Sequence, residues 1–144
     1  MTMIKRGLVL AIALLSCASS AAAQVLTPPT GTTGLTPIEG SVTNVEPVRV
    51  PLGDAVTGSE TRVTLQFQLQ GCLDSLMPLI THYEVRGRRV NVYVTALNAH
   101  NEQSMVARCV AMPQVSEQVR IPGLFQRNQI RVVFMGQLPE TRPE

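Results

Sequence analysis

The chain is poor in the residue types that mark several common functions. Its 144 residues contain no tryptophan, two tyrosines and three phenylalanines, so the stacking platforms of single-strand nucleic-acid binders are largely missing. Lys5, the only lysine, and Arg6 precede an apolar run; without these two, ten arginines balance ten acidic residues. A neutral domain has no general attraction to nucleic acid or to an anionic membrane. We therefore expect no nucleic-acid partner.

The first residues predict export. "MTMIKR" is a short positive region, "GLVLAIALL" is an apolar run of nine residues, and "SCASSAAAQ" contains an A-x-A site at Ala21–Ala23. This is the pattern of a secretory signal peptide over residues 1–23, with Gln24 as the new N-terminus. The apolar run is too short to span a bilayer, and no later segment approaches the required length. We expect a periplasmic or secreted protein with no transmembrane segment in the mature chain.

A second interpretation of the same region remains open. "LLSC" at residues 14–17 resembles the lipobox of bacterial lipoproteins, in which Cys17 would be lipidated and become the first residue. The leucine two positions before Cys17 fits that pattern poorly, and the alanines that follow would then have no purpose. Soluble export is therefore preferred, with a lipid anchor at Cys17 as the alternative.

Cys72 and Cys109 are the two cysteines that remain in the folded domain. An even count in an exported chain predicts a disulfide. A redox pair would prefer close spacing such as C-x-x-C, whereas these cysteines lie far apart in the chain. In the chain-entropy model, closing a loop of this length stabilises the folded state by about 4 kcal/mol.

Period-two patterning predicts strands throughout residues 41–137. In the clearest strand, Val63, Leu65, Phe67 and Leu69 alternate with a polar face of Thr64, Gln66, Gln68 and Gln70. The sequence "RGRR" at residues 86–89 predicts a tight hairpin turn, in which Gly87 can adopt positive φ. No stretch shows a helical period. The predicted strand segments are 40–54, 59–71, 79–85, 89–98, 105–112, 115–121 and 129–135.

These segments predict an all-β fold, a single antiparallel β-sandwich of about seven strands, immunoglobulin-like, with one disulfide. Pro47 and Pro51 cannot donate to a ladder, so the first strand is expected at a sheet edge. Residues 24–40 are rich in Thr, Pro and Gly and predict a flexible linker. Residues 138–144 predict a polar tail.

The order of these features resembles a known type of domain. The pattern "GC…V-x-G-x-x-V-x-V…C-x-A…V-x-I-P-G-L-F…I-R-V-V-F-x-G", over about Thr61 to Gly136, is similar to small exported bacterial β-sandwich domains of unknown function. In those domains an aromatic residue often follows the turn glycine, and here Leu124 and Phe125 stand at that place. The resemblance implies no catalytic residue.

The densest charge in the chain is the arginine turn. Arg86, Arg88 and Arg89, together with Arg108, could form an anion patch for phosphate, glycan or an acidic partner. The alternative is that these charges keep a hairpin tip soluble and protect a sheet edge. The polar face of the 59–71 strand offers hydrogen bonds to a sugar or a partner strand, although such a face is usually only solvated.

Catalytic and metal sites are weakly indicated. Asp74, Ser75 and His82 are the residue types of a nucleophile triad, but nothing resembles a G-x-S-x-G elbow. A metal-dependent enzyme using His82 and His100, with Asp74 or Glu84 nearby, is a remaining alternative. We expect no enzyme, no cofactor and no metal.

The sequence thus predicts a non-catalytic exported module of the cell envelope that binds a protein or glycan partner or serves a structural role. The alternative in another class is an inhibitor of a protease or lysozyme. In that case the loops "NAHNEQS" at residues 98–104 and "GLFQRN" at residues 123–128 would contact the enzyme.

Overall fold

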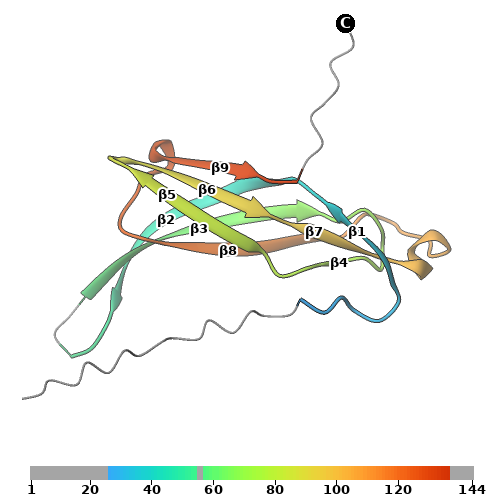
Figure 1. Ribbon diagram of the computed structural model, residues 1–144. Coiled ribbons are helices and arrows are strands. Elements are labelled where there is room, and N and C mark those ends of the chain that lie inside the picture. The colour runs from blue at the N-terminus through green and yellow to red at the C-terminus, as the bar shows by residue number, and fades with distance from the viewer. Residues whose placement is uncertain (1–25, 55–56, 137–144) are drawn as a thin grey trace, which may run out of the picture.

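The computed structural model describes residues 26–54 and 57–136, and this part of the chain is mostly β-structure (Figure 1). The predicted signal peptide over residues 1–23, Cys17 and the predicted tail at 138–144 lie outside the described residues. The elements are β1 (Thr32–Pro37), β2 (Gly40–Pro51), β3 (Thr57–Gln68), β4 (Ser75–Leu76), β5 (Ile80–Arg86), β6 (Arg89–Thr95), β7 (Leu97–Asn101), η1 (Glu102–Met105), β8 (Gln114–Pro122), η2 (Arg127–Gln129) and β9 (Ile130–Phe134). They form three small sheets, in the orders β1-β7-β4, β2-β3-β8 and β5-β6-β9.

The predicted alternation of the strand around Leu65 is confirmed. Val63, Leu65 and Phe67 of β3 are fully buried, and Leu69 just beyond its end is nearly so. The side chains between them are half-buried or exposed. In the same way β6 buries Val90, Val92 and Val94, and Ala96 follows at the next inward position.

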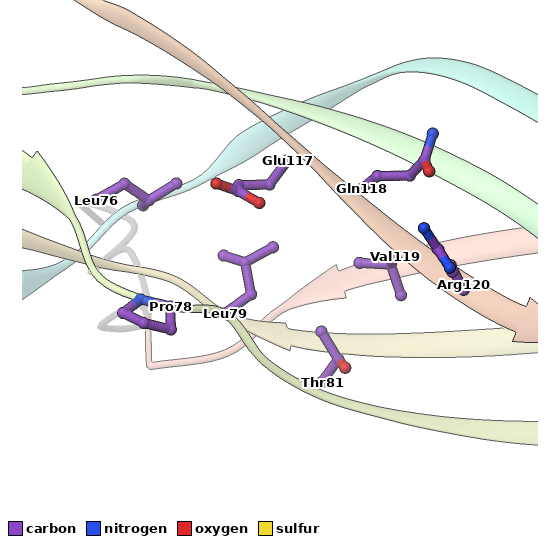
Figure 2. A pocket seen from close by; sticks show the side chains of 8 residues that line it. All are labelled: Leu76, Pro78, Leu79, Thr81, Glu117, Gln118, Val119 and Arg120. Atoms are coloured by element: carbon purple, nitrogen blue, oxygen red, sulfur yellow. The ribbon is translucent and has the colours of Figure 1, made fainter. Parts of the chain in front are cut away.

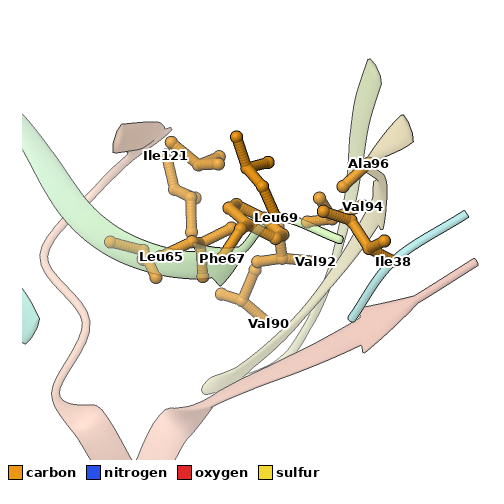
Figure 3. Close-up of a cluster of buried hydrophobic side chains, with 11 residues drawn as sticks. Ile38, Leu65, Phe67, Leu69, Val90, Val92, Val94, Ala96 and Ile121 are labelled. Carbon is orange, nitrogen blue, oxygen red and sulfur yellow. The ribbon is translucent and has the colours of Figure 1, made fainter. Parts of the chain in front are cut away.

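The inward side chains of β3 and β6 meet in one apolar cluster (Figure 3). Val119 and Ile121 of β8 and Ile38 join it. The rings of Phe67 and Phe134 meet edge to face with centroids 5.9 Å apart. The core is therefore built mainly from valine, leucine and isoleucine, as the low aromatic content requires.

The predicted hairpin and edge strand are also confirmed. β5 and β6 are antiparallel with Arg86 opposite Arg89, and Gly87 between them has a φ of 60°. β2 lies at the edge of its sheet and carries Pro47 and Pro51, with a break in register between Val42 and Asn44.

One strand pair is parallel, whereas the sequence predicts antiparallel pairs. β9 pairs with β6 in parallel, with Val92 opposite Val132. The expectation of a purely antiparallel fold is therefore wrong at this edge. Parallel neighbours need a long crossover, and the chain supplies one because β7, η1 and β8 lie between the two strands in sequence.

The predicted flexible linker contains a strand. Residues 32–37 form β1, which pairs with β7, and Ile38 after it is buried in the core. The prediction of a loose arm over residues 24–40 is wrong for this part. The strand is ordered by a partner at least 60 positions away in the chain, which local composition does not reveal.

Two predictions near residue 100 are also wrong. The expected polar loop at 98–104 begins within β7, where Asn98 and Ala99 are buried. The expected strand at 105–112 is instead an irregular loop that follows η1. The buried carboxylate of Asp74 accepts hydrogen bonds from polar side chains of this region, which allows a polar sequence to form a buried strand.

Candidate functional site

Two surface regions carry the candidate functional residues. The first, which we call the arginine groove, lies beside the β5–β6 turn and the start of β9. The turn brings Arg86 and Arg89 together, and the parallel register sets Arg131 of β9 beside Asn91 of β6. The depression has a volume of about 360 Å³ and is lined by Arg86, Arg89, Val90, Asn91, Asn128, Gln129, Ile130 and Arg131.

The charge of the arginine groove is only partly compensated. Arg86 bonds Glu84 two residues away on the same strand, at 3.0 Å; Arg86 is largely and Glu84 partly in solvent, so this pair contributes little stability. Arg89 and Arg131 form no ion pair with any residue that the structure describes. Their guanidinium groups can bind a carboxylate, phosphate or sulfate in bidentate geometry, and the neighbouring amides can bind hydroxyl groups.

The predicted arginine patch is thus brought together only in part. Arg86 and Arg89 line the groove, whereas Arg88 at the turn does not. Arg108 lies in the loop after η1. Figure 1 shows this loop and the β5–β6 turn at opposite ends of the molecule. Arg131 was missed because only the parallel pairing of β9 with β6 brings it here, and no local signal in the sequence indicates that pairing.

The second region is a loop held by the predicted disulfide. Cys72 and Cys109 are bonded, with Cα atoms 5.6 Å apart, which confirms the pairing. The bond ties the irregular segment after η1 to the turn that follows β3. We call residues 102–113 the braced loop.

Asp74 holds the other end of the braced loop. Its carboxylate has no exposed surface and accepts four hydrogen bonds. The donors are Ser104 Oγ at 2.6 Å, Asn98 Nδ2 at 2.7 Å, Asn101 N at 3.0 Å and His100 Nδ1 at 3.1 Å. Gly71 lies so close that a Cβ atom there would be 2.6 Å from Asp74 Oδ1.

These hydrogen bonds determine the charge of Asp74. Burial by itself would raise the pKa of the carboxyl, but the bonds from Ser104, Asn98, the Asn101 amide and His100 together hold that pKa well below its usual range. The side chain is therefore ionised in the folded protein. A sequence signal for this cluster exists, because Asn98 continues the inward positions of Val94 and Ala96 and so places a polar group in the core.

The braced loop presents apolar side chains to solvent. Met105 and Val106 are 81% and 82% exposed, and Val110 is fully exposed. Met112 of the same loop and Leu73, which follows Cys72, are also exposed. The amide of Ala107 donates to Gln103 O at 3.0 Å, which fixes the turn after η1. Apolar groups held rigidly in solvent are typical of a protein-docking surface.

The residues considered for catalysis are not arranged as a triad. Asp74 binds Ser104 and His100 rather than Ser75 and His82. Ser104 and His100 both bond the carboxylate, so no histidine stands between a serine and an aspartate. An aspartate with a depressed pKa is also a weak base.

The two histidines lie on different sheets. His82 of β5 stacks on Tyr93 with ring centroids 6.2 Å apart, whereas His100 of β7 bonds Asp74. Within residues 26–54 and 57–136, no three His, Cys, Asp or Glu side chains are grouped so that they could hold a metal ion. A metal centre built on His82 and His100 thus has no geometric support in this part of the chain.

Two glutamines of the predicted polar face, and the loop at 123–128, form internal hydrogen bonds. Gln66 Nε2 donates to Gln114 Oε1 at 2.9 Å, and Thr36 Oγ1 donates to Gln70 Oε1 at 2.8 Å. The loop at 123–128 is anchored by buried Thr61, whose hydroxyl donates to Gly123 O and accepts from the Phe125 amide, both at 2.8 Å. Leu124 remains exposed and Phe125 is half-buried.

No protein-family model, no curated protein and no solved structure matches this chain. The resemblance to small exported β-sandwich domains therefore stays a prediction. Across the described ranges, none of the helices has both the length and the apolar character needed to cross a bilayer.

Proposed function

We propose that this protein is an exported, non-catalytic module of the cell envelope, whose arginine groove binds an anionic group on a protein or glycan partner. The observation that carries the proposal is the convergence of Arg86, Arg89 and Arg131 with three amide side chains on one depression of about 360 Å³. Guanidinium and amide groups in one concave site are suited to a ligand that carries both acidic and hydroxyl groups.

The framework suits a binding module. We propose an immunoglobulin-like β-sandwich in which the sheets β2-β3-β8 and β5-β6-β9 are the two layers around the core. The signal-peptide pattern and the disulfide favour the periplasm or the exterior, where such bonds persist. A lipid anchor at Cys17 is the alternative mode of attachment, and the intact mass of the protein from its own cells distinguishes the two.

The test is a binding titration of residues 24–144 with a sulfated or phosphorylated oligosaccharide and its neutral counterpart of equal length. We expect the acidic sugar to bind and the neutral sugar to bind far more weakly. Arg89→Gln combined with Arg131→Gln should weaken binding about tenfold or more, because each substitution removes a charged hydrogen bond.

The matched control is Arg49→Gln combined with Arg108→Gln, which removes the same charge from exposed positions outside the groove. This control should bind nearly as the parent protein does. If the two double variants lose affinity equally, binding reflects net charge and the proposed site is refuted.

The braced loop favours a second candidate, an inhibitor of an extracellular hydrolase. Its support is the exposure of Met105, Val106 and Val110 on a segment held by both a disulfide and the Asp74 cluster. Residual activity of serine proteases and of lysozyme, measured with excess protein, tests this role. Inhibition should be lost in Met105→Ser with Val106→Ser and retained in Leu52→Ser, at an exposed position between β2 and β3. A lack of inhibition by the parent protein excludes this role for those enzymes.

A further inference from the structure

Within the part of the chain that the structure describes, the sheet β2-β3-β8 leaves one edge of β8 open. Among the described strands, β8 pairs with β3 alone. At the two ends of this ladder the Gly123 amide donates to Ser59 O and the Leu69 amide donates to Pro113 O, both at 2.9 Å. Bonded and non-bonded pairs alternate in an antiparallel ladder, so these bonds determine which backbone groups face outward. The residues that face the free edge are Gln114, Ser116, Gln118 and Arg120.

The opposite edge of the same sheet is protected, whereas β8 is not. β2 carries Pro47 and Pro51 and a break in register, which are common means of preventing a further strand from adding. β8 has proline only at its ends, at Pro113 and Pro122. Its run from Gln114 to Arg120 is therefore competent to pair with another strand.

A groove runs along the free edge of β8. It has a volume of about 410 Å³ and is lined by Leu76, Pro78, Leu79, Thr81, Glu117, Gln118, Val119 and Arg120. Figure 2 shows Glu117 and Leu79 extending into the same space between β8 and the 76–81 segment. On β5, across the groove, Tyr83 and Val85 are 41% and 50% exposed. The residues opposite them on β6, Val92 and Val90, are buried. The two sheets thus leave apolar surface uncovered between β5 and β8.

Glu117 gives the groove a charge preference. It stands opposite buried Leu65 in the register and so shares the inward face of Val119 and Ile121. Its side chain forms no hydrogen bond or ion pair within the described residues. Arg120 is on the opposite face of the strand because side chains alternate. A residue placed beside Glu117 by an added strand is therefore favoured if it is basic.

We infer that the free edge of β8 accepts an extended segment of a partner protein, which adds as a fourth strand to the sheet β2-β3-β8. Backbone bonds to Ser116, Gln118 and Arg120 supply affinity, and alternate apolar side chains cover the groove. One Arg or Lys of the segment faces Glu117. This surface is independent of the arginine groove, and its test does not rely on the proposed function.

A second copy of this chain that pairs through its own β8 or β5 does not meet the same requirement. If β8 pairs with β8, Glu117 faces another inward position of that strand, which holds valine, isoleucine or glutamate. If β5 of a second copy pairs with β8, the inward residues are Thr81, Tyr83 and Val85. Neither arrangement places a basic side chain beside Glu117.

Amide hydrogen exchange measured by NMR tests the inference directly. The probe is an end-capped peptide as long as β8, in which valine alternates with threonine and the central valine is replaced by arginine. In the free protein the amides of Ser116, Gln118 and Arg120 should exchange fast, while those of Glu117 and Val119 are protected. Millimolar peptide should also slow the exchange of the Ser116, Gln118 and Arg120 amides. Unchanged exchange overturns the inference, as does protection that rises with protein concentration alone.

A charge swap tests the role of Glu117. Glu117→Arg should weaken binding of the arginine peptide about fivefold and should strengthen binding of the same peptide with a central glutamate. Glu46→Arg on the exposed face of β2 makes the same charge change at the other edge and should leave both affinities unchanged. Equal response of the two variants refutes recognition at β8.

Discussion

Replacing Asp74 by asparagine tests whether a buried carboxylate organises the braced loop. The carboxylate accepts bonds from four donors, at 2.6 to 3.1 Å. Asparagine keeps only one of the two carboxylate oxygens, so the two donors that bond the other oxygen lose their acceptor. Hydrogen bonds to charged groups contribute about 1.5–3 kcal/mol each, and rotation of the Ser104 hydroxyl recovers part of the loss. We expect Asp74→Asn to lower the free energy of unfolding by about 3 kcal/mol near neutral pH.

The pH dependence gives a second and sharper readout. Because the pKa of Asp74 is depressed by its hydrogen bonds in the folded state, its stabilisation is fully present above the ordinary aspartate pKa of about 3.9. It is lost progressively as the pH falls below that value. The stability difference between the parent protein and Asp74→Asn should therefore shrink on acidification.

Urea unfolding followed by far-UV circular dichroism measures both effects, since the chain has no tryptophan to report by fluorescence. Asp54→Asn, an exposed aspartate in the β2–β3 turn, is the matched control and should change stability by less than about 0.5 kcal/mol. A stability difference that stays constant between about pH 7 and pH 2.5 would refute the assignment of an ionised, hydrogen-bonded Asp74.

Three further predictions concern the same fold. Reducing the Cys72–Cys109 bond should cost about 4 kcal/mol of stability, measured by urea unfolding with and without reductant; an unchanged midpoint would contradict it. Gly71→Ala should lower the free energy of unfolding in urea by about 2 kcal/mol, because the added Cβ would collide with Asp74. In the double variant with Asp74→Asn, the total loss should be smaller than the sum of the two single losses. Phe67→Ala should cost about 3–5 kcal/mol in thermal or urea unfolding, since the ring is fully buried; a loss below about 1 kcal/mol would argue against this core.

The apolar alternation was the most informative signal in the sequence. It predicted the buried faces of β3 and β6, while the "RGRR" turn predicted the hairpin between β5 and β6, and Pro47 and Pro51 predicted the edge position of β2. Each of these depends on residues within one or two strands. The disulfide was also predictable, since it requires only a count of cysteines and an exported context. The candidate site was predictable in part, through the arginines of the turn.

The polar segment around Asn98 shows where such reasoning stops. Its composition predicts a loop, but Asp74 satisfies its polar groups and allows it to form buried β7. The partner lies more than 20 positions away, so no window of neighbouring residues contains both halves of the interaction.

Local sequence was enough to show which side chains of β3 and β6 are inward, because the side-chain period of a strand is two and water excludes apolar groups. The order and direction of the strands follow from the fold as a whole. It pairs β1 with β7, sets β9 parallel to β6 so that Arg131 lies in the arginine groove, and leaves one edge of β8 unpaired among the described strands. The reason is that backbone ladders bond any sequence without proline, so the choice among partners depends on the packing of the whole core.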